Sequence, residues 1–253
     1  MTVTMTAIAV ETIKPIDRPE AKVLATAENQ RMFELLTSLS EDDWSKPTDC
    51  TGWDVRALAG HVLGGMEGFC SVGRLVHLMR AAKKEAGKGS FVDGMTAVQV
   101  RERASLTHAE LLSRMADAAP QNARFRSRFP MPFRAMPMKQ ELLSGATESW
   151  KMGYLLDTIL TRDTWMHRVD ITRVTGREMV LTTEHDGRIV ADAVGEWARR
   201  HGQPFTLTLT GVVGGTFTNG SGGESITVDA IELCRIFSGR ASSGGLLAHE
   251  VPF

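Results

Sequence analysis

The sequence has few cysteines, no long apolar run and no excess of charge of either sign, and each shortage removes a class of protein. The three cysteines, Cys50, Cys70 and Cys234, stand far apart in a chain of 253 residues. An odd number of cysteines at this spacing does not suit a disulfide framework. The sequence also contains no CxxC or CxxH pair that would predict a structural zinc site. We therefore expect reduced thiols and a cytoplasmic protein.

Charge and hydropathy exclude further partners. Lysine and arginine number 29 and aspartate and glutamate 30, so the formal net charge of -1 gives no global attraction for nucleic acid or an anionic membrane. Apolar residues never run uninterrupted for about 18 positions, the length that a membrane-spanning helix needs. The expected partner is a small molecule, with no nucleic acid and no membrane, and the protein is expected to be a monomer or a homodimer.

The residues that are present predict a helical protein as far as residue 201. Hydrophobic residues make up 42% of the chain and charged residues 23%, which is typical of a globular protein with a packed core. Apolar positions recur with a helical period, which predicts a bundle of four long helices. The helices are expected around Leu24 to Leu39, from Val55 towards Ala86, from Thr96 to Ala119 before Pro120, and from Met138 to Val174 before Gly176.

The pattern changes near residue 180. A further helix over 184–201 is followed by alternating apolar and threonine residues over 205–210, which predicts a strand. Glycine-rich turns, a strand over 225–228 and a short helix over 229–237 complete a small domain of mixed structure. The predicted fold class is α+β: a flexible leader over residues 1–18, a helical bundle over 19–180, and a small α+β domain over 181–253.

One set of residues predicts a metal site. Asp163 and His167 are four apart in a helical segment, so both side chains project from one face, one turn apart. His61 lies two turns into the second helix, which Asp54 is expected to cap. Alone, the Asp163/His167 pair is more often a hydrogen-bonded pair, and His61 alone is a core histidine. Together they make a set of two imidazoles and one carboxylate, which suits Zn, Fe, Ni or Mn and leaves coordination positions open.

Four segments carry a family resemblance. KPTDCTGWDVRALAGH (46–61) and RDTWMHRVD (162–170), with DAIELCRIFSGR (229–240) and VPF (251–253) in the tail, resemble the mycothiol-dependent maleylpyruvate isomerase family. The resemblance implies an N-terminal DinB-like four-helix bundle followed by a small α+β sterol-carrier-like domain. It also implies that His61, Asp163 and His167 bind a divalent metal ion of the zinc type. The isomerase that names the family has a glutamate in place of Asp163.

The resemblance implies a thiol-dependent enzyme. A metal ion lowers the pKa of a bound thiol, so mycothiol or another low-molecular-weight thiol can be held as a thiolate near neutral pH. The thiolate adds to an activated double bond, the resulting single bond rotates, and elimination gives the trans product. The hypothesis is a metal- and mycothiol-dependent isomerase or S-transferase acting on a small electrophilic or anionic metabolite. The alternatives are a hydrolase that activates water with the metal, and a non-catalytic protein that binds a small molecule or lipid.

Several arginines are candidates for binding the cofactor. Arg168 and Asp170 flank His167, and either is expected to orient His167 or a bound anion. The other interpretation is an ion pair on the helix surface. Arg124, Arg126 and Arg134 lie in a segment that has no acidic residue, where guanidinium groups suit a carboxylate or the polar groups of a thiol. The other interpretation of this segment is a solvated connector.

Two arginines of the tail are candidates for the reaction itself. The resemblance implies that an arginine of the second domain reaches the active site, and Arg235 and Arg240 are the catalytic candidates in the matching segment. Their other interpretation is that they cap the last helix, since basic residues favour helix C-termini.

Overall fold

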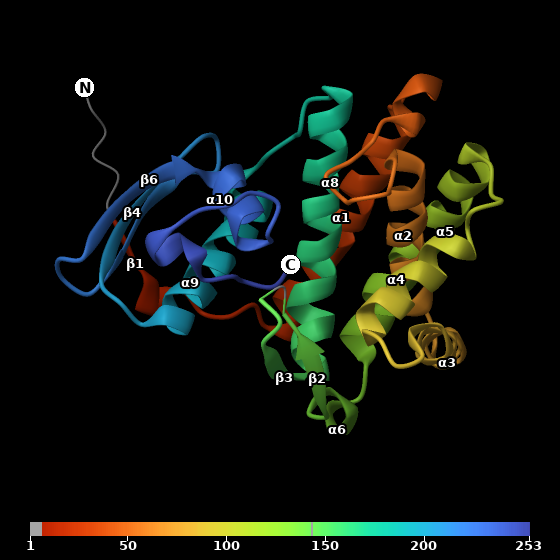
Figure 1. Cartoon of the computed structure of the whole chain (residues 1–253), viewed down its shortest axis with the longest axis horizontal. Helices are drawn as coiled ribbons and strands as arrows, with labels where there is room; N and C mark the ends of the chain where they lie inside the picture. The colour runs from red at the N-terminus through yellow and green to blue at the C-terminus, as the bar shows by residue number, and fades with distance from the viewer. Residues whose placement is uncertain (1–6, 143) are drawn as a thin grey trace. The chain divides into compact units, whose positions relative to one another are not determined.

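A computed structural model describes residues 7–142 and 144–253, and its fold is α+β, as predicted (Figure 1). The chain divides into two compact units. Of the described residues, 17–141 and 147–179 form a bundle unit, and 180–253 form a C-terminal unit together with 7–16, 142 and 144–146. Among the described residues, no helix is both long enough and apolar enough to cross a membrane.

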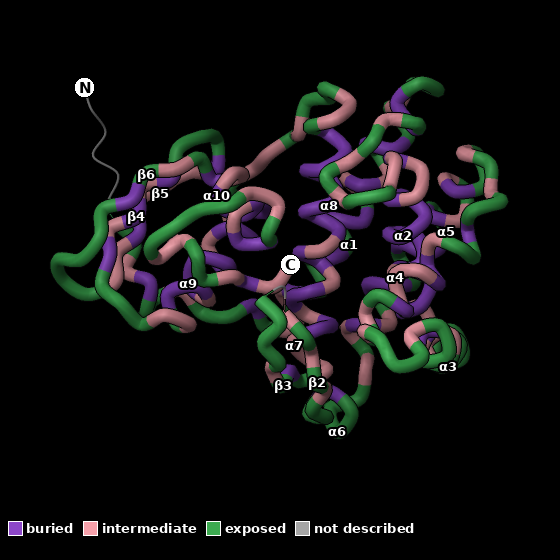
Figure 2. The backbone as a smooth tube through the Cα atoms, in the orientation of Figure 1, coloured by how far each residue is buried: buried purple, intermediate pink, exposed green. Residues whose placement is uncertain are grey.

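The bundle unit is built on four long helices that pack against one another. Their bounds are α1, Arg18–Thr37; α2, Val55–Gly68; α5, His108–Arg128; and α8, Leu160–Thr175. A helical pair, α3 (Val72–Ala86) and α4 (Phe91–Arg101), packs beside α2. Buried residues follow α2 and α8 over most of their length, whereas α3 is largely exposed (Figure 2). The bundle interior therefore lies along the two helices that carry the predicted metal ligands.

The helix predicted from Val55 to Ala86 is two helices. The backbone leaves the helical path at Phe69, and the Ser71 side chain then accepts a hydrogen bond from the backbone N–H of Arg74. Serine at this position starts a new helix because its hydroxyl pairs a backbone donor that the first turn leaves without a partner. The expectation of one continuous helix was wrong because this cap was not recognised.

The prediction that Pro120 ends a helix was also wrong, since Pro120 lies inside α5. Proline removes one backbone donor and normally kinks or breaks a helix. Here Pro120 itself is exposed, while Met115, Ala118 and Ala123 on either side of it are buried. The packing of the whole helix against α1 and α2 outweighs the loss of one hydrogen bond.

The segment from Met138 is an antiparallel hairpin, not the start of the last long helix. Strands β2 (Pro137–Glu141) and β3 (Thr147–Lys151) pair with Met138 opposite Trp150. After the short helix α7 (Met152–Tyr154), a single π-helical turn, Leu155–Ile159, leads into α8. As predicted, α8 ends at Gly176, which takes the left-handed conformation that glycine adopts without strain.

The described part of the C-terminal unit is a four-stranded sheet with helices. The bounds of its main elements are β1, Ile8–Ala9; α9, Arg188–His201; β4, Phe205–Thr210; β5, Gly215–Asn219; β6, Glu224–Asp229; and α10, Ala230–Phe237. The strands lie in the order β1-β5-β4-β6, with β4 antiparallel to β5 and parallel to β6. Trp197, Phe205 and Phe237 form the aromatic core of the unit.

Two features of this unit differ from the sequence analysis. The leader expected over residues 1–18 includes β1, which pairs in parallel with β5, and α1 already begins at Arg18; residues 1–6 of that leader lie outside the described residues. Strand β5 was missed because its short apolar pattern, with only Phe217 buried, lies between glycines that predict turns.

Candidate metal centre

His61 is placed by the start of α2. The Asp54 side chain caps this helix, as predicted, and accepts a hydrogen bond of 2.7 Å from the backbone N–H of Ala57. Val55 and Leu58 are fully buried, and the helical period carries His61 to the same interior side, where it is 7% exposed. The Trp53 ring packs against the imidazole, with 5.0 Å between the ring centroids. The histidine therefore enters the interior of the bundle in a restricted position.

Asp163 and His167 come from one face of α8. Their spacing of four residues brings His167 Nε2 within 3.3 Å of Asp163 Oδ1. The His167 side chain is 6% exposed and that of Asp163 is 32% exposed. Since both imidazoles are buried, the site opens towards solvent on the side of the carboxylate.

The three side chains converge across the two helices. His61 Nε2 lies 3.6 Å from Asp163 Oδ2, and the two imidazole centroids are 4.9 Å apart. One ligand atom from each residue lies within 4.8 Å of the others. Ligands about 2.0–2.1 Å from a tetrahedral ion are about 3.3 Å apart, so the measured separations suit a shared cation. The structure thus brings together the three residues that the sequence analysis singled out.

The electrostatics of these three side chains favour a positive charge between them. Burial alone would raise the pKa of Asp163, but the neighbouring imidazoles of His167 and His61 hold it well below its usual range. Burial would lower the pKa of His167, but the Asp163 carboxylate raises it well above its usual range. A proton on His167 and a metal ion at the same centre therefore compete for the same negative charge.

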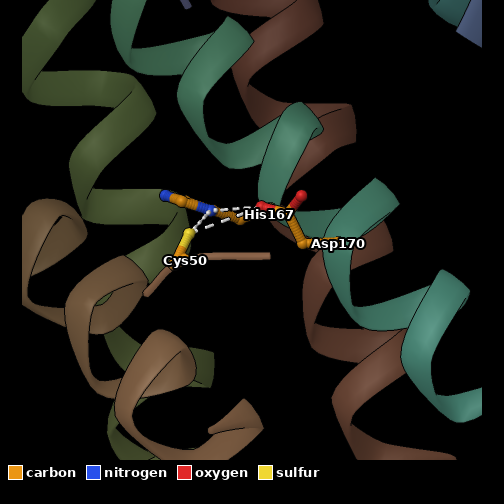
Figure 3. Close-up of side chains that lie close together, drawn as sticks. All are labelled: Cys50, His167 and Asp170. Carbon is orange, nitrogen blue, oxygen red and sulfur yellow. Dashed lines mark hydrogen bonds and ion pairs between the residues drawn. The ribbon is translucent and has the colours of Figure 1, made fainter. Parts of the chain in front are cut away.

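A buried carboxylate orients His167 from its other side (Figure 3). Asp170 Oδ2 lies 3.0 Å from His167 Nδ1, and Asp170 is completely buried. With one proton held on Nδ1 by this contact, Nε2 is the nitrogen that faces Asp163, and it can bind a cation once it has given up its own proton. Carboxylate–histidine pairs of this kind fix the tautomer and the ring orientation of metal-binding histidines. The Nδ1 atom of His61, by contrast, is buried without a hydrogen-bond partner among the described residues.

Cys50 is the neighbour of this centre that sequence reasoning missed. The sequence analysis took it only as one of three reduced thiols, yet its Sγ lies 3.7 Å from Asp170 Oδ2 and 3.9 Å from His167 Nδ1. Backbone hydrogen bonds from Thr48 to Trp53 and from Trp53 to Cys50 hold the loop that carries it. The signal in the sequence was its position four residues before the cap of the helix that carries His61.

Two of the predicted cofactor-binding arginines are engaged inside the bundle. Arg168 forms a two-pronged ion pair with Glu28 of α1, at 2.8 and 3.0 Å, and this pair is buried between two helices, not on the helix surface as the second interpretation had it. Arg126 is also buried and donates to the backbone carbonyl of Leu156 and, at 2.7 Å, to the Thr161 hydroxyl. Arg126 therefore ties α5 to the π-helical turn and the first turn of α8.

The other two arginines of that segment differ in exposure. Arg134 is buried, donates to the backbone carbonyl of Arg126 and forms an ion pair with Asp157. Arg124 is exposed. A cofactor-binding role for Arg124, Arg126, Arg134 and Arg168 stays a prediction.

The two catalytic candidates lie at the end of α10 in the C-terminal unit. The Arg235 guanidinium donates to Glu232 at 3.0 Å and to the backbone carbonyl of Arg240 at 3.4 Å. The backbone N–H of Arg240 donates in turn to the carbonyl of Arg235, at 2.8 Å. These contacts organise the helix end, and a catalytic role for either arginine stays a prediction.

Comparisons with known proteins agree with the resemblance carried by the sequence motifs. The sequence profile of the mycothiol maleylpyruvate isomerase N-terminal domain matches residues 25–172, more than half of the chain. A crystal structure of the mycothiol-dependent maleylpyruvate isomerase covers 95% of this chain and 94% of its own, with a TM-score of 0.56 and 15% identity. That of a histidine-to-alanine mutant has the same coverage, with a TM-score of 0.55 and 16% identity. At such identities the likeness establishes the fold, and no curated protein matches the sequence.

Proposed function

Because the chain belongs to the mycothiol maleylpyruvate isomerase family, we propose that it is an enzyme that uses a divalent metal ion and mycothiol, or a closely related thiol. The observation that carries the proposal is the convergence of His61, Asp163 and His167 at ligand spacing, from two helices of the matched domain. When bound there, a cation of the zinc type would supply the positive charge that keeps a thiol ionised near neutral pH.

The residues of the chain prepare this centre for a thiol and a substrate. Asp170 holds the His167 ring in the orientation that directs Nε2 to the centre. Trp53 packs against His61 and restricts its ring. The partial exposure of Asp163 leaves an approach for small molecules, while the buried imidazoles close the opposite side. The reaction class that suits this arrangement is thiol-dependent cis–trans isomerisation, or transfer of the thiol to a small electrophile.

Asp163 bears on which of these reactions the chain performs. An aspartate is one methylene shorter than glutamate, so it reaches less far from the α8 backbone towards His61. We propose that the ion lies closer to α8 than a glutamate would hold it. A change in ion position alters the room for the substrate, which is why the substrate is stated only as a small electrophilic or anionic metabolite.

The test is the dependence of activity on added thiol. The metal-loaded full chain is assayed with maleylpyruvate and with a set of small electrophiles, each with mycothiol, with glutathione and without thiol. We expect turnover only with a thiol, and most with mycothiol. The same assay is applied to Arg235→Ala and Arg240→Ala. Neither variant should change the metal content, so a loss of thiol-dependent turnover would show that the replaced arginine takes part in the reaction. Equal turnover with and without thiol would replace this function by the water-activating hydrolase.

A further inference from the structure

A second set of ligand-forming atoms surrounds the other nitrogen of His167 (Figure 3). Cys50 Sγ lies 3.9 Å from His167 Nδ1 and 3.7 Å from Asp170 Oδ2, and Nδ1 and Oδ2 are 3.0 Å apart. All three residues belong to the bundle unit. A thiol, an imidazole and a carboxylate together form a donor set for thiophilic cations such as Zn²⁺, because thiolate selects soft metals and the other two donors complete the shell.

The spacing of these three atoms suits the bond lengths between a zinc ion and its ligands. A point equidistant from the three atoms lies about 2.1 Å from each, close to the Zn–N and Zn–O distances of about 2.0–2.2 Å and slightly less than the Zn–S distance of about 2.3 Å. A small outward movement of Cys50 brings the sulfur to its usual distance. The three atoms are already in contact, through a hydrogen bond between His167 and Asp170 and longer contacts of both residues to the sulfur.

Burial and access fit a site that a cation enters from one side. His167 and Asp170 are 5% and 0% exposed, so water does not compete strongly for their donor atoms. Cys50 is partly exposed and belongs to the loop before α2, so a cation can approach past the thiol. The Asp170 carboxylate, the Cys50 thiolate and the deprotonated His167 ring would offset the charge of a divalent ion, and the ring would share its negative charge with the ion at Nε2.

We propose that Cys50, His167 and Asp170 form a second metal site, for a thiophilic cation such as Zn²⁺ or Cd²⁺, which shares His167 with the centre formed by His61 and Asp163. Binding there would release the thiol proton of Cys50 and the Nδ1 proton of His167 to solvent, so that His167 would bridge the two ions as an imidazolate. The contact that orients His167 is thereby replaced by the second ion, so occupancy of one site changes the donor strength of His167 at the other. This site needs no mycothiol and extends beyond the proposed function.

The experiment is a titration of the zinc-loaded full chain with Cd²⁺, followed by the ultraviolet thiolate-to-cadmium charge-transfer band and by metal analysis after gel filtration. We expect the band to saturate at about one equivalent of cadmium in the wild type and in the control variant Cys70→Ser. It should be absent in Cys50→Ser, with cadmium affinity at least about tenfold weaker. Cadmium that merely replaces zinc between His61 and Asp163 has no thiolate ligand and gives no band.

A second measurement uses the wild-type protein, so its result does not depend on whether a variant folds correctly. Alkylation of Cys50 by iodoacetamide, mapped by mass spectrometry, should slow at least about tenfold when one equivalent of Cd²⁺ is present. An unchanged alkylation rate, or a charge-transfer band that persists in Cys50→Ser, overturns the proposal. Neither result bears on thiol-dependent turnover, so this site and the proposed function fail separately.

Discussion

Replacing Asp170 by asparagine removes the charge that orients His167 while keeping the shape of the side chain. Asp170 is completely buried and lies 3.0 Å from His167 Nδ1, so solvent screens this contact little. Loss of an outer partner of a metal-binding histidine typically weakens metal affinity by about 10- to 100-fold, equivalent to about 1.4–2.7 kcal/mol. A hydrogen bond to a charged group contributes about 1.5–3 kcal/mol, which places the expected effect in the upper part of that range.

The assay measures zinc affinity by competition with a chromophoric chelator. Less than one equivalent of zinc is used, so that only the site with the higher zinc affinity is filled. We expect Asp170→Asn to weaken zinc binding by about 30- to 100-fold. The matched control is Asp117→Asn, the same chemical change at an exposed position of α5, which should leave the affinity unchanged. An effect of less than about threefold for Asp170→Asn would refute the reasoning that this carboxylate fixes the ring.

Three further predictions concern the ligand carboxylate, the bundle and pH. Asp163→Asn should strongly reduce the metal content, whereas Asp163→Glu should retain the ion and change the activity. Equal metal content and equal activity in the wild type and both variants would show that Asp163 is not a ligand. Glu28→Gln removes the charge of the carboxylate that forms the two-pronged ion pair with the buried Arg168 guanidinium, and it should lower the free energy of unfolding in urea by about 3–5 kcal/mol. A loss below about 1 kcal/mol would contradict this. Because the Asp163 carboxylate outweighs burial and raises the pKa of His167, the contribution of His167 to the stability of the chelator-treated protein should be fully present below about pH 6.5 and be lost as pH rises through the raised pKa. In His167→Gln this part of the pH dependence of the free energy of unfolding should be absent.

The positions of the candidate ligands were predictable because they depend on local geometry. A spacing of four places Asp163 and His167 on one face of any helix, and Asp54 at a cap position fixes where α2 begins. The apolar positions of α2 then determine which side of the helix faces the interior. The meeting of the two helices at ligand distance follows from bundle packing, which the family resemblance indicated.

Features that depend on tertiary packing were not predictable in the same way. The approach of Cys50 to Asp170 depends on how the loop before α2 packs against α8, and no spacing in the sequence encodes that distance. The helix continues through Pro120 because the residues around it are buried against other helices. A prediction from the helix propensity of single residues does not include this stabilisation by packing. The β2–β3 hairpin was misassigned because its residues also suit a helix start, and only their pairing across the turn separates the two structures.

The central claim is that His61 and His167 hold a metal ion with Asp163. Its most direct test is metal analysis of the full chain purified without chelators, then loaded with less than one equivalent of zinc, beside the double variant His61→Ala, His167→Ala. The account predicts stoichiometric uptake of the added zinc by the wild type and almost none by the double variant, with helical content preserved. Undiminished zinc uptake in the double variant, or none in the wild type, would contradict it.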